Sequence, residues 1–289
     1  MILASGRGIV PMYNSGVKNV YAVSSFVLLA AAGSLFAQTV QKLDPAIDRL
    51  APPKSVANRV ATDFNKWNEG PVRARSNFLL FAEIPGNNIM IWRPGGIASV
   101  FLHPSGYKGS APFGGPEPAS NGMTLDARGR LTVVGHARRN VGRLAKLDPS
   151  ATVTVLADTY EGKQLNSPND LVHKSDGSLY FTDPPYGLPT QSDQDPAKQL
   201  KVNGVYRIVG AGDQKPGAPP DRAKLQASHS GSAETEWDCV FTRREIPLRR
   251  QLQAEKLWMR YSVQPDGCLA NGKVLYDAPW KGRPGDRTA

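Results

Sequence analysis

The chain has 289 residues, of which 40% are hydrophobic and 21% charged, and it carries a formal net charge of +10. This length allows one large or two ordinary domains with a substantial core, and the composition excludes a low-complexity chain. The net charge raises the question of a nucleic-acid or anionic-surface partner. The chain lacks the usual nucleic-acid-binding motifs, so we expect no nucleic-acid partner.

The positive charge is unevenly distributed, and the chain has few cysteines that could form disulfides. Several positive charges are crowded into a short stretch that contains Arg243, Arg244, Arg249 and Arg250. The two cysteines, Cys239 and Cys268, are too few to form a disulfide framework, although a single disulfide stays open.

An apolar run at residues 20–33 is preceded by Lys18. The run is short for a membrane span and is typical of a secretory signal peptide, here ending near Ala37. Met12 offers a start that would give a more ordinary leader. An uncleaved anchor is the alternative, because Leu35 is not the small residue expected near the cut. We therefore expect residues 1–37 to be an N-terminal extension and signal peptide, and the mature protein to be exported, periplasmic or secreted, without a stable membrane span.

The rest of the chain favours an all-β fold. Its 28 glycines and 24 prolines make turn formers frequent, long amphipathic helices are scarce, and the strand-like segments are short. In chain order, strands are expected at 79–82, 88–92, 142–147, 171–173, 179–182 and 204–208, with a long loop at 184–203.

Two segments of the chain, residues 121–131 and 169–179, repeat one another. Asn121 is followed by Gly129 in the same way that Asn169 is followed by Gly177, so both the Asn and the Gly recur 48 residues later. A period of about 40 to 50 residues with several strands in each unit is what a β-propeller blade requires.

The second copy belongs to the most informative motif of the chain, NSPNDLVHKSDGSLYFTDPPYGL at residues 166–188. Asn169 and Asp170 directly precede a predicted strand, and Asp176 with Gly177 marks the tight turn to the next one. Polar groups at the starts of such strands can converge on a shared cavity.

This motif resembles the gluconolactonase, senescence-marker-protein (regucalcin) and diisopropyl fluorophosphatase superfamily of six-bladed β-propellers. The resemblance covers residues 69–208 and returns at 256–278. It implies that the first strand of each blade surrounds a central channel, where polar residues from each repeat meet.

The resemblance also implies a metal site. In the family, a Glu of an EGP motif, the Asn of the PND motif, an Asn of a later PNG motif and an Asp of a PDG motif surround one divalent cation, commonly calcium. Glu69 and Asn169 match the first two. Hard oxygen ligands suit Ca²⁺ or Mg²⁺ more than a thiol-seeking metal, with Zn²⁺ a further option. The alternatives to metal binding are that Glu69 is a solvent-exposed carboxylate and that Asn169 forms a turn.

Four more assignments follow from the same resemblance. Asn169 is also a candidate substrate-binding residue, and Asn121, at the same place one repeat earlier, is either a substrate-side or a structural residue. Asp170 is expected to orient Asn169 without binding the metal itself, and Asp183 is expected to order the loop that follows it.

His136 is the candidate catalytic residue. It matches a histidine that lies near the channel mouth in the family, where it can touch the substrate. Val134 and Ala137 depart from the family pattern on either side of it, and a lone histidine is more often structural.

The resemblance disappears at residues 235–252, which lack strand periodicity and carry the crowded arginines. The PNG motif is absent there, and the sequence stops at Ala289, where the PDG motif would begin. A frameshift explains both losses, and a divergent insertion is the alternative. We therefore expect residues 38–289 to form an incomplete propeller of about four blades' worth of sequence, disrupted at 234–255, that binds metal poorly.

The function implied by the resemblance is that of a metal-dependent hydrolase that opens a sugar lactone. The cation would act as a Lewis acid on the lactone carbonyl, and a carboxylate would assist proton transfer. A phosphotriester-type substrate is an alternative on the same scaffold. The rival hypotheses are a non-catalytic propeller that binds a sugar or a protein, and an inactive pseudogene product.

Overall fold

A computed structural model describes residues 42, 45–49, 51–56, 59–62, 67–211, 225–231, 236–239, 245–252 and 255–278. The chain divides into two compact units, residues 1–59 and 60–289. In the first, the described residues form one short 3₁₀ helix, η1 (Pro45–Arg49). The predicted signal peptide lies outside the described residues. Within the described ranges, no helix is long and apolar enough to cross a membrane.

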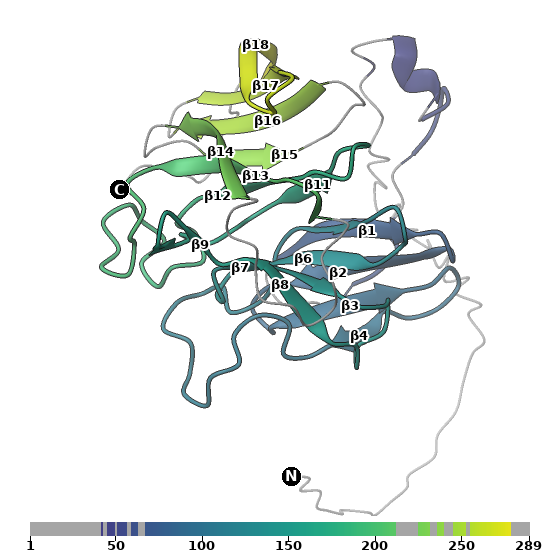
Figure 1. Ribbon diagram of the computed structural model, residues 1–289. Helices are drawn as coiled ribbons and strands as arrows, with labels where there is room; N and C mark the ends of the chain where they lie inside the picture. The colour runs from purple at the N-terminus through teal and green to yellow at the C-terminus, as the bar shows by residue number, and fades with distance from the viewer. Residues whose placement is uncertain are drawn as a thin grey trace, which may run out of the picture. The chain divides into compact units, whose positions relative to one another are not determined.

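The second unit is built from antiparallel sheets of four strands, each hydrogen-bonded in chain order (Figure 1). The first sheet contains β1 (Asn68–Ala74), β2 (Phe78–Glu83), β3 (Asn88–Trp92) and β4 (Ser99–Leu102). The second contains β5 (Met123–Leu125), β6 (Leu131–Gly135), β7 (Asn140–Leu144) and β8 (Val153–Ala157). The third contains β11 (Leu171–His173), β12 (Leu179–Asp183), β13 (Asn203–Ile208) and β14 (Leu225–Gly231). The fourth contains β15 (Glu236–Cys239), β16 (Glu245–Leu252), β17 (Glu255–Val263) and β18 (Leu269–Ala278).

A short ribbon of β9 (Thr159–Tyr160) and β10 (Lys163–Gln164) lies between the second and third sheets in the sequence. The predicted all-β class is confirmed. Four sheets of four strands in the described part of the chain agree with the four blades' worth of sequence that we expected.

The 48-residue repeat corresponds to the turn between the first two strands of a sheet. Gly129 lies between β5 and β6 with φ +76°, and Gly177 lies between β11 and β12 with φ +82°. The amide of Gly177 donates to the carbonyl of Lys174 at 3.0 Å, and Asp176 Oδ1 accepts the amide of Ser178 at 2.9 Å. A glycine is favoured at both positions because its backbone adopts a positive φ without a steric cost.

Most predicted strands are confirmed, and the loop at 184–203 lies between β12 and β13. The strand expected at 142–147 is shifted to β7. The reason is the hairpin that precedes it: Arg139 has φ +58°, and Gly135 pairs with Asn140, so the strand begins two residues earlier.

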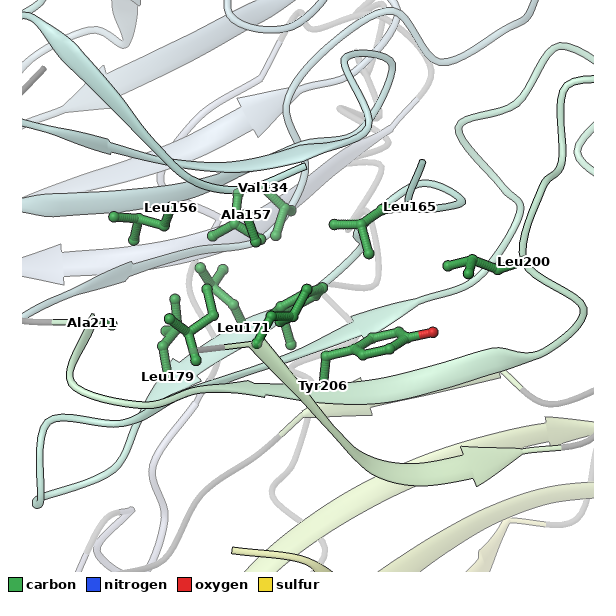
Figure 2. Close-up of a cluster of buried hydrophobic side chains, with 13 residues drawn as sticks. Val134, Leu156, Ala157, Leu165, Leu171, Leu179, Leu200, Tyr206 and Ala211 are labelled. Carbon is green, nitrogen blue, oxygen red and sulfur yellow. The ribbon is translucent and has the colours of Figure 1, made fainter. Parts of the chain in front are cut away.

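Neighbouring sheets pack through shared apolar side chains. Figure 2 shows Val134, Leu156 and Ala157 of the second sheet facing Leu171 and Leu179 of the third. Each fully buried leucine of this kind stabilises the fold by roughly 1.5 to 3 kcal/mol relative to an exposed one.

The same packing joins the other pairs of sheets. Leu80 and Ile89 of the first sheet share a cluster with Leu131 and Leu144 of the second. Between the third and fourth sheets, Tyr180 shares an apolar cluster with Tyr261, and its hydroxyl donates to the carbonyl of Gly267 at 3.1 Å. Successive sheets that pack face to face in this way are what a propeller requires.

The lack of strand periodicity at residues 235–252 does not keep the described residues there from forming strands. They hold β15 and β16, and β16 pairs with β17 along its whole length, from Glu245 opposite Ser262 to Leu252 opposite Glu255. Strand pairing uses main-chain groups, so a segment without side-chain alternation can still complete a sheet beside an available edge. The frameshift hypothesis concerns the coding DNA and stays a prediction.

Candidate metal and substrate site

The first strands of the second and third sheets start side by side. The amide of Gly122 donates to the carbonyl of Asn169 at 2.8 Å, which ties the start of β5 to the start of β11. A Cβ atom on Gly122 would lie only 2.5 Å from Asp170 Oδ1 and 2.7 Å from Asp170 Cα. Glycine is therefore required for this close approach.

The first strand of the first sheet joins the same row. Gly70 has φ +56°, and a Cβ atom there would lie 2.5 Å from the carbonyl oxygen of Asn121. Glu69 directly precedes Gly70 in β1. The structure therefore brings Glu69, Asn121 and Asn169 to the starts of three neighbouring strands, at one edge of three sheets.

The three side chains have different surroundings. Glu69 is exposed and lines a cavity of about 240 Å³ together with Leu79 and Phe81. Asn169 is 6% exposed, and its main chain is fixed because its amide donates to the carbonyl of Thr182 at 2.9 Å.

Asn121 carries an unpaired polar atom. It is 2% exposed, and its Nδ2 atom has no hydrogen-bond partner among the described residues. Leaving a buried donor unpaired costs roughly 1 to 3 kcal/mol, so this group suits an oxygen of a bound molecule. Its position agrees with the substrate-side role predicted for Asn121.

His136 is fully buried directly after β6. Its Nδ1 lies 3.1 Å from the carbonyl oxygen of Pro168, the residue before Asn169. Its Nε2 lies 2.7 Å from Oε2 of Glu117, although no hydrogen bond of good geometry forms at that nitrogen within the described part of the chain. A Cβ atom on Gly187 would lie 2.7 Å from the imidazole, so the loop after β12 packs closely on the ring.

Glu117 was not predicted from the sequence. Its Oε1 accepts a hydrogen bond from Nε2 of Gln191 at 2.6 Å, and the same nitrogen donates to the carbonyl of Tyr186 at 3.0 Å. The only sequence signal at Glu117 is a lone carboxylate in a segment rich in glycine and proline. Its partners lie far away in the sequence, and only the fold brings them together.

Asp183 is fully buried at the end of β12. Its Oδ2 accepts the amide of Asn166 at 2.8 Å, and its carbonyl accepts Nδ2 of Asn166 at 2.9 Å. Burial raises the pKa of Asp183 to about 7, against the opposing effect of the amides of Asn166 and Ser167 and of the charges on Arg139 and Lys198. Asp183 thus fastens the segment that leads into Asn169, and its predicted ordering of the following loop stays a prediction.

Asp170 stabilises its own strand. Its Oδ1 accepts the amide of Leu171 at 2.8 Å, and its amide donates to Oγ1 of Thr182 at 3.1 Å. These contacts fix the main chain directly beside Asn169. The role of Asp170 in orienting the Asn169 side chain stays a prediction.

Comparison with known proteins identifies the family. The family model described as the SMP-30/Gluconolactonase/LRE-like region matches residues 67–216. This chain belongs to the SMP-30/gluconolactonase/LRE-like family. It is 36% identical over 261 residues to a gluconolactonase from Zymomonas mobilis, covering 83% of this chain and 72% of that protein.

Two solved structures share the fold of this family member. One, an X-ray structure designated a gluconolactonase, is 24% identical with a TM-score of 0.62, over 82% of this chain and 72% of the other. The second, a gluconolactonase from Xanthomonas campestris, is 25% identical with a TM-score of 0.55, over 74% and 63% of the two chains. The β-propeller fold class expected from the sequence is confirmed.

The resemblance to this family implies a divalent cation, and the side chains at the shared edge can be tested for ligands that suit it. The described residues contain no group of three or more His, Cys, Asp or Glu side chains that could hold a metal. Glu69 and Asn169 nevertheless provide a carboxylate and an amide oxygen on neighbouring sheets, both ligand types that hard cations prefer. The donors fit a divalent cation in kind, but they are fewer than a full ligand set.

Proposed function

We propose that this protein is a hydrolase of the gluconolactonase type that opens the ring of a sugar lactone with the help of a divalent cation. The observation that carries the proposal is the 36% identity to the Zymomonas mobilis gluconolactonase over 83% of the chain. The edge shared by Glu69, Asn121 and Asn169 supplies the place where the reaction would occur.

Glu69 and Asn169 would hold the cation, most simply Ca²⁺, with Mg²⁺ and Zn²⁺ as alternatives. When bound, the cation supplies Lewis-acid polarisation of the lactone carbonyl oxygen. The unpaired Nδ2 of Asn121 donates a hydrogen bond to an oxygen of the substrate. A carboxylate of the site accepts a proton from the attacking water, the bond between the acyl carbon and the ring oxygen breaks, and the proton passes to the new hydroxyl group.

The experiment that tests this proposal measures glucono-δ-lactone hydrolysis by the purified protein. We expect hydrolysis above the spontaneous rate with millimolar Ca²⁺, loss of that excess rate with EDTA, and recovery on adding Ca²⁺ back. A rate equal to the spontaneous one in every cation tested contradicts the proposal. An unchanged rate in EDTA contradicts only the role of the cation.

The second candidate function is a non-catalytic propeller that binds a sugar or a protein partner. The observation that favours it is the small number of cation ligands, Glu69 and Asn169, at the shared edge. Saturable binding of a sugar without hydrolysis would distinguish this candidate from the lactonase. We also propose that the protein is located in the periplasm or outside the cell, on the strength of the predicted signal peptide. Recovery of the protein only in the cytoplasmic fraction would contradict this location, and an intact N-terminus would contradict cleavage of the leader.

A further inference from the structure

Glu117 differs from Asp126, Asp170 and Asp183 in the groups that its carboxylate binds. Asp126, Asp170 and Asp183 each accept a main-chain amide, which is how carboxylates usually shape turns and strand ends. Among the described residues, the contacts of the Glu117 carboxylate are with two side chains, those of Gln191 and His136. Glu117 is therefore held by side chains rather than used to hold the main chain.

The position of Glu117 follows from its contact with His136. The carbonyl of Val134, two residues before His136, accepts the amide of Asn121 at 3.1 Å. The other ring nitrogen of His136 lies against Pro168, next to Asn169. The carboxylate of Glu117 is thus linked through the His136 ring to Pro168, the residue before Asn169.

The Glu117 carboxylate is partly exposed and can accept further hydrogen bonds. Its side chain is 14% exposed, whereas that of His136 is fully buried. Each carboxylate oxygen has two lone pairs. The hydrogen bond from Gln191 uses one on Oε1, and Nε2 of His136 lies 2.7 Å from Oε2. The remaining lone pairs can accept hydrogen bonds from hydroxyl groups.

We propose that Glu117 is a specificity-determining residue whose carboxylate accepts hydrogen bonds from ring hydroxyl groups of the lactone. His136 and Gln191 are positioning residues that fix the carboxylate, and buried His136 acts on the substrate through Glu117. This inference rests on the proposed lactonase function and assigns a residue that recognises the ring hydroxyl groups of its substrate.

The test compares Glu117→Gln with the wild-type protein on glucono-δ-lactone and on δ-valerolactone, which lacks ring hydroxyls. A hydrogen bond to a charged group contributes about 1.5 to 3 kcal/mol, so we expect KM for gluconolactone to rise about 10- to 100-fold, with kcat changed less than about threefold. For δ-valerolactone, kcat/KM should stay within about twofold. Glu161→Gln, an exposed carboxylate in the β9–β10 turn, is the matched control and should change neither substrate.

Two results would overturn the inference. An equal loss on both lactones would show that Glu117 has only a structural role, and no change on either would show that it does not contact the substrate. Should Glu117→Gln fail to fold, Gln191→Ala replaces it, and it should also raise KM selectively for gluconolactone.

A failure of the lactonase proposal is recognised separately, because the wild-type protein would then hydrolyse neither lactone. In that case, binding of 1,5-anhydroglucitol, a ring polyol that cannot be hydrolysed, is measured by calorimetry. We expect Glu117→Gln to bind it at least about tenfold more weakly than the wild type. Equal binding by both proteins, or no binding by either, contradicts the role of Glu117.

Discussion

At the scale of single residues, Gly122 sets how closely the strands of the site approach. An alanine there would place its Cβ 2.5 Å from Asp170 Oδ1 and 2.8 Å from the carbonyl oxygen of Asn169, and the second of these atoms belongs to the main chain. We expect Gly122→Ala to lower the free energy of unfolding by about 1 to 3 kcal/mol through overpacking. Urea unfolding measures this change.

The control for Gly122→Ala is Gly96→Ala, where the added Cβ would approach nothing closer than the carbonyl oxygen of Arg93 at 3.4 Å. We expect its midpoint in urea to stay close to that of the wild type. Equal midpoints for the two variants would mean that the strands at the site are not held as closely as the structure shows.

Asp183 gives a second prediction at this scale. Its pKa is raised from 3.8 to about 7 by burial, so the folded state favours the protonated carboxyl. The stability that depends on this protonation is present below pH 3.8 and is lost as pH rises through about 7, at about 1.4 kcal/mol per pH unit between the two values. Asp183→Asn should remove this part of the pH dependence, and urea unfolding at pH 5 and pH 7.5 measures it. Parallel pH profiles for variant and wild type would contradict the assignment.

The candidate site could be predicted in part from single motifs. Asn169 and Glu69 lie in short strings that carry the family resemblance, so the sequence was enough to name them. Glu117 could not be named in this way, because its partners His136 and Gln191 are 19 and 74 residues away in the sequence and meet it only in the folded protein. Local patterns do not encode such long-range contacts.

At the scale of elements, His173 of β11 links the third sheet to the second. Its Nε2 lies 3.2 Å from Oγ1 of Thr132 in β6. Burial lowers its pKa to about 4, against the opposing effect of the Asp126 charge, and the charges of Arg143 and Arg130 lower it further. The contact between the two sheets is therefore made by a neutral imidazole.

This burial predicts a loss of stability in acid. The contribution of His173 is fully present above pH 6.5 and is lost as pH falls through about 4, because the unfolded chain then binds the proton more readily. His173→Gln keeps a side chain that can bond Thr132 but cannot titrate, so its unfolding free energy should fall less than that of the wild type between pH 6.5 and pH 4.5. An identical fall in both proteins would show that His173 is not held neutral.

The elements were predictable where turn chemistry fixed them. Gly129 and Gly177 mark equivalent turns because a positive φ favours glycine, and their spacing in the sequence was enough to define the blade repeat. The strand β16 was missed because its sequence shows no alternation. Its place is set by pairing with β17, which is a contact between main chains and leaves no signature in the side chains.

At the scale of the whole molecule, the repeated sheets and the family motifs led to the same fold. The ligand set of the site did not follow in the same way, since only Glu69 and Asn169 match the expected donors. Affinity for calcium depends on the number and charge of the ligands. We therefore expect calcium to bind more weakly than micromolar in a calorimetric titration, and tight binding of one ion per chain would show that further ligands complete the site.

The unusual segment at 234–255 also affects the number of calcium ligands, because the PNG motif of the family is absent there. If a frameshift produced it, the coding DNA read one base later encodes the PNG motif and its following strand. Resequencing that DNA decides between a frameshift and a true insertion. A restored PNG motif should raise calcium affinity in the corrected protein, whereas DNA that cannot encode this motif contradicts the frameshift.

The central claim is that a sugar lactone is opened at the edge where Glu69, Asn121 and Asn169 meet. The most direct measurement is the rate of glucono-δ-lactone hydrolysis by the wild-type protein and by Asn169→Ala, at millimolar Ca²⁺ and with folding checked by circular dichroism. We predict hydrolysis above the spontaneous rate for the wild type and a loss of at least about 100-fold in kcat/KM for a folded Asn169→Ala. Equal rates for the two folded proteins would contradict the account.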